Sequence, residues 1–186
     1  MKTAIFGGTF NPIHSAHLAM ARLAADRLCL DQVLFVPAGR PPHKEAATPY
    51  EDRYRMVEIA CAADSRFVPS RLEEGAAKSY SIHTIERVKA GNPGPLFFII
   101  GSDAFAEIET WYRWQDVISA VEFIVVARPG HSIDPPAGAI VHRLDDVALP
   151  VSSSEIRRRL ASGQMPPEVP PAVADYIHEH RLYRKS

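Results

Sequence analysis

Residues 4–17 are Ala4-Ile5-Phe6-Gly7-Gly8-Thr9-Phe10-Asn11-Pro12-Ile13-His14-Ser15-Ala16-His17, an apolar run that leads through paired glycines to two histidines. The apolar run predicts a strand buried on both faces, as in a parallel sheet. Glycine allows the backbone to approach a bound phosphate, and a helix that follows directs its free N–H groups and positive dipole end there. His14 and His17 can face one side of that helix and donate hydrogen bonds. The segment therefore predicts a phosphate-binding site.

Two simpler interpretations of this segment compete with phosphate binding. A glycine pair after a strand is often only a turn, and a histidine pair can bind a metal or lie in solvent at a helix end. The segment is neither a G-x-G-x-x-G fingerprint nor a Walker loop. A metal site requires further Cys, His or carboxylate ligands, and none lies nearby in the sequence.

Short apolar runs recur along the chain and alternate with helical patterns. The further strands are expected at 33–36, 96–100 and 123–126, with weaker candidates at 66–70 and 139–142. Helices are expected at about 17–28, 50–63, 81–90, 114–120, 152–162 and 172–180. Ser152 and Glu155 form a capping-box signature at the fifth helix. The alternation predicts an α/β fold: one Rossmann-like, doubly wound parallel sheet with helices on both faces, in a single domain over 1–186 with a helical segment from about residue 152.

Composition limits the classes of partner. A length of 186 residues suffices for one sizeable core, and a net charge of −1 gives no overall basic field to attract nucleic acid or an anionic membrane. No apolar run is long enough for a signal peptide or a membrane span. Cys29 and Cys61 lie in helical segments and are expected to be reduced core thiols, which suits the cytoplasm. We expect a soluble cytoplasmic protein that binds neither nucleic acid nor membrane.

The expected sheet places the segments that follow its strands at one site. In doubly wound sheets the ligand binds beyond the carboxyl ends of the strands, where the strand order reverses. Five segments rich in Gly, Ser, His, Lys or Arg are expected to meet there: 7–17, 37–44, 101–103, 128–130 and 152–157.

These segments together resemble the nucleotidyltransferase superfamily whose signature ends in His-x-Gly-His. Within it, the chain is similar over essentially its whole length to the bacterial nicotinate-nucleotide adenylyltransferase family. The resemblance rests on Pro41-Pro42-His43-Lys44, Asp52-Arg53-Tyr54-Arg55-Met56, Ser79-Tyr80-Ser81-Ile82-His83-Thr84, Ile100-Gly101-Ser102-Asp103, Thr110-Trp111-Tyr112 and Val151-Ser152-Ser153-Ser154-Glu155-Ile156-Arg157. Four positions depart from the pattern: Asn11 for Asp, Ala16 for Gly, His83 for Asp and Ser154 for Thr.

The resemblance implies that the phosphate of nicotinate mononucleotide attacks the α-phosphorus of ATP directly and that pyrophosphate leaves. A phosphate monoester is largely dianionic near neutral pH, so no general base is required. The site must align two anions and neutralise charge on the leaving group. By the resemblance, the catalytic residues are His14, His17, Lys44 and Arg157, with Arg157 on the β- and γ-phosphates.

The resemblance also implies two sets of binding residues. ATP is expected to contact Gly7, Gly8, Thr9, Phe10, Gly101, Asp103, Arg128, Ser153 and Ile156. Nicotinate mononucleotide is expected to contact Lys44, Thr84, Trp111 and Tyr112. Mg²⁺ is the expected cofactor, held mainly by ATP oxygens and water rather than by protein ligands.

Several alternatives stay open at this point. Asp103 can equally cap a helix, and Trp114 is expected to be a core residue. A sister enzyme of the phosphopantetheine adenylyltransferase type and a non-catalytic nucleotide sensor are the rival functions. The sequence leaves open the oligomeric state and the degree of preference for the acid over the amide.

Overall fold

The computed structural model describes residues 1–41, 48–127, 133–145 and 151–184. Over these ranges six strands form one parallel sheet in the order β3-β2-β1-β4-β5-β6. The strands are β1 (Thr3–Gly8), β2 (Gln32–Pro37), β3 (Phe67–Pro69), β4 (Leu96–Gly101), β5 (Glu122–Val126) and β6 (Val141–Leu144). The predicted Rossmann-like α/β sheet is confirmed.

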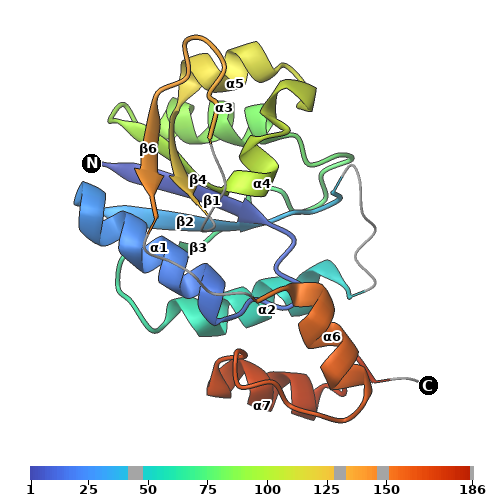
Figure 1. Ribbon diagram of the computed structural model, residues 1–186. Coiled ribbons are helices and arrows are strands. Elements are labelled where there is room, and N and C mark those ends of the chain that lie inside the picture. The colour runs from blue at the N-terminus through green and yellow to red at the C-terminus, as the bar shows by residue number, and fades with distance from the viewer. Residues whose placement is uncertain (42–47, 128–132, 146–150, 185–186) are drawn as a thin grey trace.

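Helices cover both faces of the sheet (Figure 1). One face carries α1 (Ser15–Leu28), α2 (Tyr50–Cys61), α6 (Ser153–Ala161) and α7 (Pro171–Glu179). The other carries α3 (Ser81–Gly91), α4 (Ser102–Phe105), the 3₁₀ turn η1 (Ile108–Thr110) and α5 (Trp114–Ala120). Each face has its own apolar core because side chains alternate along the strands: Ala4 and Phe6 belong to the first core, and Ile5 to the second.

The sequence located the regular elements well, with small exceptions. All six predicted helices are found, with bounds within two residues of the expected ones. The last strand begins at Val141 rather than at residue 139, and the short elements α4 and η1 were not expected.

The two cysteines differ in their surroundings. Cys61 is a buried core thiol as predicted, but the prediction is wrong for Cys29, which is exposed. Cys29 follows the last turn of α1 with a left-handed φ of 52°, and this turns it away from the apolar face of the helix.

The strand order reverses between β1 and β4. From β1 the chain passes outward to β2 and β3, then returns to β4 on the opposite side of β1. The segments after β1 and β4 therefore diverge and leave a crevice at the carboxyl edge. No helix in the part of the chain that the structure describes is long and apolar enough to cross a membrane.

Candidate active site

A cavity of about 310 Å³ lies at this reversal point. Its walls come from three of the five predicted segments and from the end of β5, and they include His14, His17, Gly101, Asp103, Ser152 and Ser153. A hydrogen bond beside the cavity links residues that lie 141 positions apart in the sequence: the Ser153 hydroxyl donates to the Pro12 carbonyl at 3.3 Å. The topological prediction of one shared site holds for these three segments.

The protonation of His17 follows from a single hydrogen bond. The His14 backbone N–H donates to Nδ1 of His17 at 3.2 Å, so that nitrogen carries a lone pair. Burial, followed by the neighbouring His14, lowers the pKa of His17 well below 6.5. The ring is therefore neutral near pH 7 and its proton sits on Nε2. His17 lines the cavity as an uncharged donor.

His14 stacks directly on this ring. The two imidazole centroids lie 3.8 Å apart, and His14 is only 4% exposed. Burial lowers its pKa to about 4, although the nearby Glu168 acts in the opposite direction. Its Nδ1 is buried without a hydrogen-bond partner in the described structure. Neither histidine supplies positive charge, so the cation for a bound phosphate comes from elsewhere.

The loop between β1 and α1 is packed around Phe10. This residue adopts a left-handed φ of 46°, and its ring lies edge-on to His17 with centroids 5.1 Å apart. A Cβ on Gly8 would approach the Phe10 ring to 3.1 Å. Glycine at position 8 therefore relieves close packing inside the loop itself, in addition to any close approach of a ligand.

Arg157 joins the late helix to this loop. Its Nη1 donates to the Asn11 carbonyl at 2.8 Å and its Nη2 to the Ser154 hydroxyl at 3.2 Å. The predicted cap of α6 is confirmed, because Ser152 Oγ accepts from the Glu155 N–H at 3.2 Å. Arg157 of α6 thus contacts the same β1–α1 loop that leads to the histidine pair.

Helical spacing in the run Arg157-Arg158-Arg159 predicts one arginine toward the site and the other two, Arg158 and Arg159, in solvent. Arg158 is 79% exposed and pairs with Glu155, in agreement with that prediction. The prediction is wrong for Arg159, which is about one third exposed and bonds Glu168 at 3.3 Å. The reason is that the segment after α6 folds back toward the helix.

Three of the residues expected to bind the pyridine nucleotide, Thr84, Trp111 and Tyr112, lie outside the cavity walls. Thr84 is buried and its hydroxyl donates to Glu73 at 2.6 Å. Trp111 is half-buried, edge-on to Phe98. Tyr112 is 51% exposed and its ring stacks near that of Tyr80 at 4.6 Å.

The remaining predicted residues are placed as follows. Lys44 and Arg128 lie outside the described residues. Asp103 lines the cavity in the first turn of α4, and the alternative that it caps this helix is wrong because Gly101 is the N-cap. Ile156 is 2% exposed within the core, so its side chain does not line the cavity. Trp114 packs partly buried against the core, as expected.

Three polar residues near the site were not predicted: Arg53, Glu73 and Tyr183. Tyr183 donates to Asn11 Oδ1 at 2.7 Å, and Arg53 is only 2% exposed. A signal for Arg53 existed in the sequence, because it shares helical spacing with the core residues Met56, Val57 and Ala60. A charged residue on an otherwise apolar stripe indicates a buried polar function.

Comparisons with known proteins identify relatives of this chain. The cytidylyltransferase-like family model matches residues 5–159. A protein of Solibacter usitatus named "Probable nicotinate-nucleotide adenylyltransferase" is 59% identical, covering 98% of this chain and all of its own. A protein of the same name from Thermus thermophilus is 42% identical over 99% of this chain and 100% of its own.

A solved structure shares the fold at greater sequence distance. The Plasmodium falciparum nicotinic acid mononucleotide adenylyltransferase complexed with NaAD superposes with a TM-score of 0.82 at 22% identity. The match covers 98% of this chain and 97% of that one. On the family model and the curated relatives together, the chain belongs to the nicotinate-nucleotide adenylyltransferases of the cytidylyltransferase-like family.

Proposed function

We propose that this family member transfers the adenylyl group of ATP to nicotinate mononucleotide and releases pyrophosphate, with His14, His17 and Arg157 as catalytic residues. The observation that carries the proposal is the joining of the histidine pair, Asp103 and the start of α6 around one cavity. The names of the relatives supply the substrates.

In this mechanism a phosphate oxygen of the mononucleotide attacks the α-phosphorus of ATP. The new P–O bond forms as the bond to the β-phosphate oxygen breaks, and pyrophosphate leaves with its electron pair. Because the nucleophile is already anionic near pH 7, the site contributes alignment and charge stabilisation. His17 donates from Nε2 to an α-phosphate oxygen, and its neutrality preserves this donor throughout the reaction.

Arg157 supplies the positive charge that the neutral histidines lack. Its guanidinium carries further N–H donors beyond the two that bond Asn11 and Ser154, and these serve the β- and γ-phosphates. The N-terminus of α6 adds its dipole and its first-turn backbone N–H groups, among them that of Ser153. Lys44 and Arg128 are proposed to add positive charge on the family resemblance alone.

Mg²⁺ is proposed to arrive with ATP and to neutralise phosphate charge. Across the ranges that the structure describes, no three His, Cys, Asp or Glu side chains gather in a way that could hold a metal ion. A hard cation with mostly water and phosphate ligands fits such a site, and Asp103 is the one carboxylate among the described residues that line the cavity. When bound, the ion supplies electrostatic stabilisation of the leaving pyrophosphate.

The other half of the site is proposed to bind the pyridine nucleotide through Thr84, Trp111 and Tyr112. We further propose that residues 1–186 act as one domain, since Ile156 and Val173 of the late helices share a core with Phe6 of β1. A cytoplasmic location is proposed because both cysteines are free thiols.

Pyrophosphate release tests the function directly. The purified protein with ATP, Mg²⁺ and nicotinate mononucleotide should release pyrophosphate and form the dinucleotide, whereas phosphopantetheine in place of the mononucleotide should not support release. Release with phosphopantetheine alone would favour the sister enzyme. Binding of ATP and the mononucleotide without any release would favour the nucleotide sensor.

A further inference from the structure

Arg53 is a buried cation beneath the phosphate loop. It lies in the first turn of α2 and is 2% exposed. Its Nη1 donates to two carbonyl oxygens at 2.9 Å each, that of Thr9 after β1 and that of Ala38 after β2. Its Nε donates to the Thr48 carbonyl at 3.2 Å. One nitrogen therefore ties together the loops that follow two adjacent strands.

The charge of this guanidinium has no carboxylate partner among the residues that the structure describes. The groups near it are carbonyl oxygens, Tyr183 and the ring of Tyr50, whose centroid is 5.5 Å away. Burying a charge without a counter-ion is costly in folding. Such a cost is tolerated where a substrate supplies the missing negative charge, and two phosphate-bearing substrates bind here under the proposed function.

The bonds to Arg53 also orient two backbone donors. In a trans peptide the C=O and the next N–H point in opposite directions, and both peptides concerned are trans. The N–H groups of Phe10 and Gly39 therefore point away from Arg53. Neither donates a hydrogen bond to another group in the described part of the protein. Each loop thus presents one free donor whose direction Arg53 sets.

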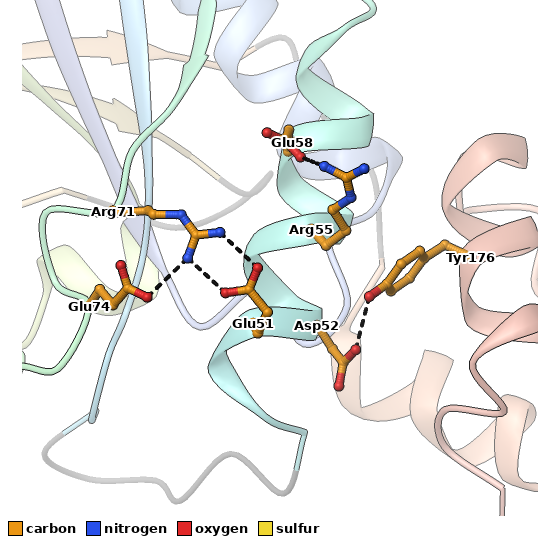
Figure 2. A network of polar contacts seen from close by, with 7 residues as sticks. All are labelled: Glu51, Asp52, Arg55, Glu58, Arg71, Glu74 and Tyr176. Carbon is orange, nitrogen blue, oxygen red and sulfur yellow. Dashed lines mark hydrogen bonds and ion pairs between the residues drawn. The ribbon is translucent and has the colours of Figure 1, made fainter.

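The helix that carries Arg53 is anchored on two sides, as Figure 2 shows. Arg71 donates two hydrogen bonds to Glu51, both at 2.7 Å. On the other side Tyr176 of α7 donates to Asp52 at 2.9 Å. The backbone at Arg53 is therefore fixed, and its side chain is a second link between the two loops, beside the Ala38 N–H that donates to the Gly8 carbonyl at 2.8 Å.

Gly39 has little freedom of its own. A Cβ there would lie 1.9 Å from the Glu73 carbonyl oxygen, so the second loop is pressed against the segment before α3. Its position is set by that contact on one side and by Arg53 on the other.

We propose that Arg53 is a positioning residue that couples the two substrates: by holding the carbonyls of Thr9 and Ala38 on one nitrogen, it makes ATP and nicotinate mononucleotide bind more tightly together than singly. The proposal rests on the proposed function. Contact of ATP with the Thr9 loop restrains the Thr9 carbonyl, and the shared guanidinium passes this restraint to the Ala38 carbonyl; the reverse holds by thermodynamic reciprocity.

The test measures the affinity for an ATP analogue with a methylene bridge between the α- and β-phosphorus, with and without saturating nicotinate mononucleotide. The unmodified protein should bind the analogue about tenfold more tightly when the mononucleotide is present. Arg53→Met should reduce this ratio to about one. Arg53→Lys keeps a buried ammonium with several donors and should restore part of the ratio.

Arg55→Met is the matched control. Arg55 lies on the same helix, is exposed and pairs with Glu58, so the coupling ratio should stay at the unmodified value. A purely structural role for Arg53 lowers the fraction of folded protein and leaves the ratio unchanged. A folded Arg53→Met protein with the unmodified ratio would overturn the proposal.

A measurement on the unmodified protein avoids any failure of the variants to fold. Amide hydrogen exchange at Gly39 should slow several-fold when the ATP analogue alone is added. Unchanged exchange would overturn the proposal, as would a coupling ratio of one in the unmodified, active enzyme. Absence of pyrophosphate release from the natural substrates is a different result, because it removes the proposed function instead.

Discussion

The ATP side of the candidate site and its pyridine-nucleotide side are built differently. The ATP side is formed by turns at strand ends, and its polar groups are already fixed: His17 by the His14 N–H, and Arg157 by the Asn11 carbonyl. His17 lines the cavity, and Arg157 contacts the β1–α1 loop that forms one of its walls. They are preorganised for an anion, which is what electrostatic catalysis requires.

The proposed pyridine-nucleotide side is formed by side chains of α3 and of the exposed turn after η1, not by turns at strand ends. The Thr84 hydroxyl donates to Glu73, while Tyr112 is half exposed against Tyr80. The difference predicts that the ATP side binds its substrate without rearrangement, whereas the proposed acceptor side must exchange internal partners for substrate. Variants on each side test that contrast.

Replacing His17 should have the largest effect. His17→Ala removes the Nε2 donor, so kcat should fall on the order of a hundredfold or more, as for the loss of a transition-state donor elsewhere. The melting temperature should change little, because the His14 N–H then faces the cavity and can bond water. Steady-state kinetics and thermal unfolding measure the two effects.

His17→Gln is the matched control for the helix start. Glutamine at this position can still accept from the His14 N–H, as in a capping box, but it displaces the donor from the position of Nε2. Stability should equal that of the unmodified protein while kcat remains low. Full activity in either variant would remove His17 from the mechanism.

The same contrast explains what the sequence could and could not predict. Short apolar runs located the strands, and parallel topology then brought His14, Asp103 and Ser153 together whatever their separation in the chain. No topological rule of this kind predicts which side chains meet on the proposed acceptor side. Nothing in the spacing of Glu73 and Thr84 indicates that they bond across a buried gap.

Arg53 and Tyr183 show a second limit. Both bond backbone or side-chain atoms of the β1–α1 loop, at sequence separations of 44 and 172 residues. Periodicity assigns such residues to a helix face or a terminal segment, but it does not say which loop oxygen they reach. That information lies in the packing of α2 and of the chain after α7 on the first core.

The pH dependence of stability should be the next largest effect, and it concerns the ATP side. The folded pKa of His14 is lowered to about 4 by burial, against 6.5 when unfolded. Between these values the unfolded chain binds more protons, so stability falls as pH falls from about 6.5 to 4. The loss from His14 should be on the order of 3 kcal/mol, with a further loss from His17.

Urea unfolding at a series of pH values measures this loss. His14→Asn keeps a good N-cap residue and removes the titrating ring, so the fall in stability toward acid should be smaller. An unchanged slope in that variant would show that the ring of His14 does not carry the effect.

Thr84→Val should have the smallest effect, and it decides whether the acceptor side binds substrate through this residue. Loss of the hydroxyl should raise the KM for nicotinate mononucleotide about fivefold and leave the KM for ATP unchanged. It should also lower the free energy of unfolding by about 1–3 kcal/mol, because Glu73 loses its hydrogen-bond donor. The double variant Thr84→Val with Glu73→Leu removes both partners, so stability should recover while the KM stays high. Recovery of both the stability and the KM in the double variant would mean that the Thr84 hydroxyl serves Glu73 alone. The proposed acceptor side would then have no substrate contact at this position of α3.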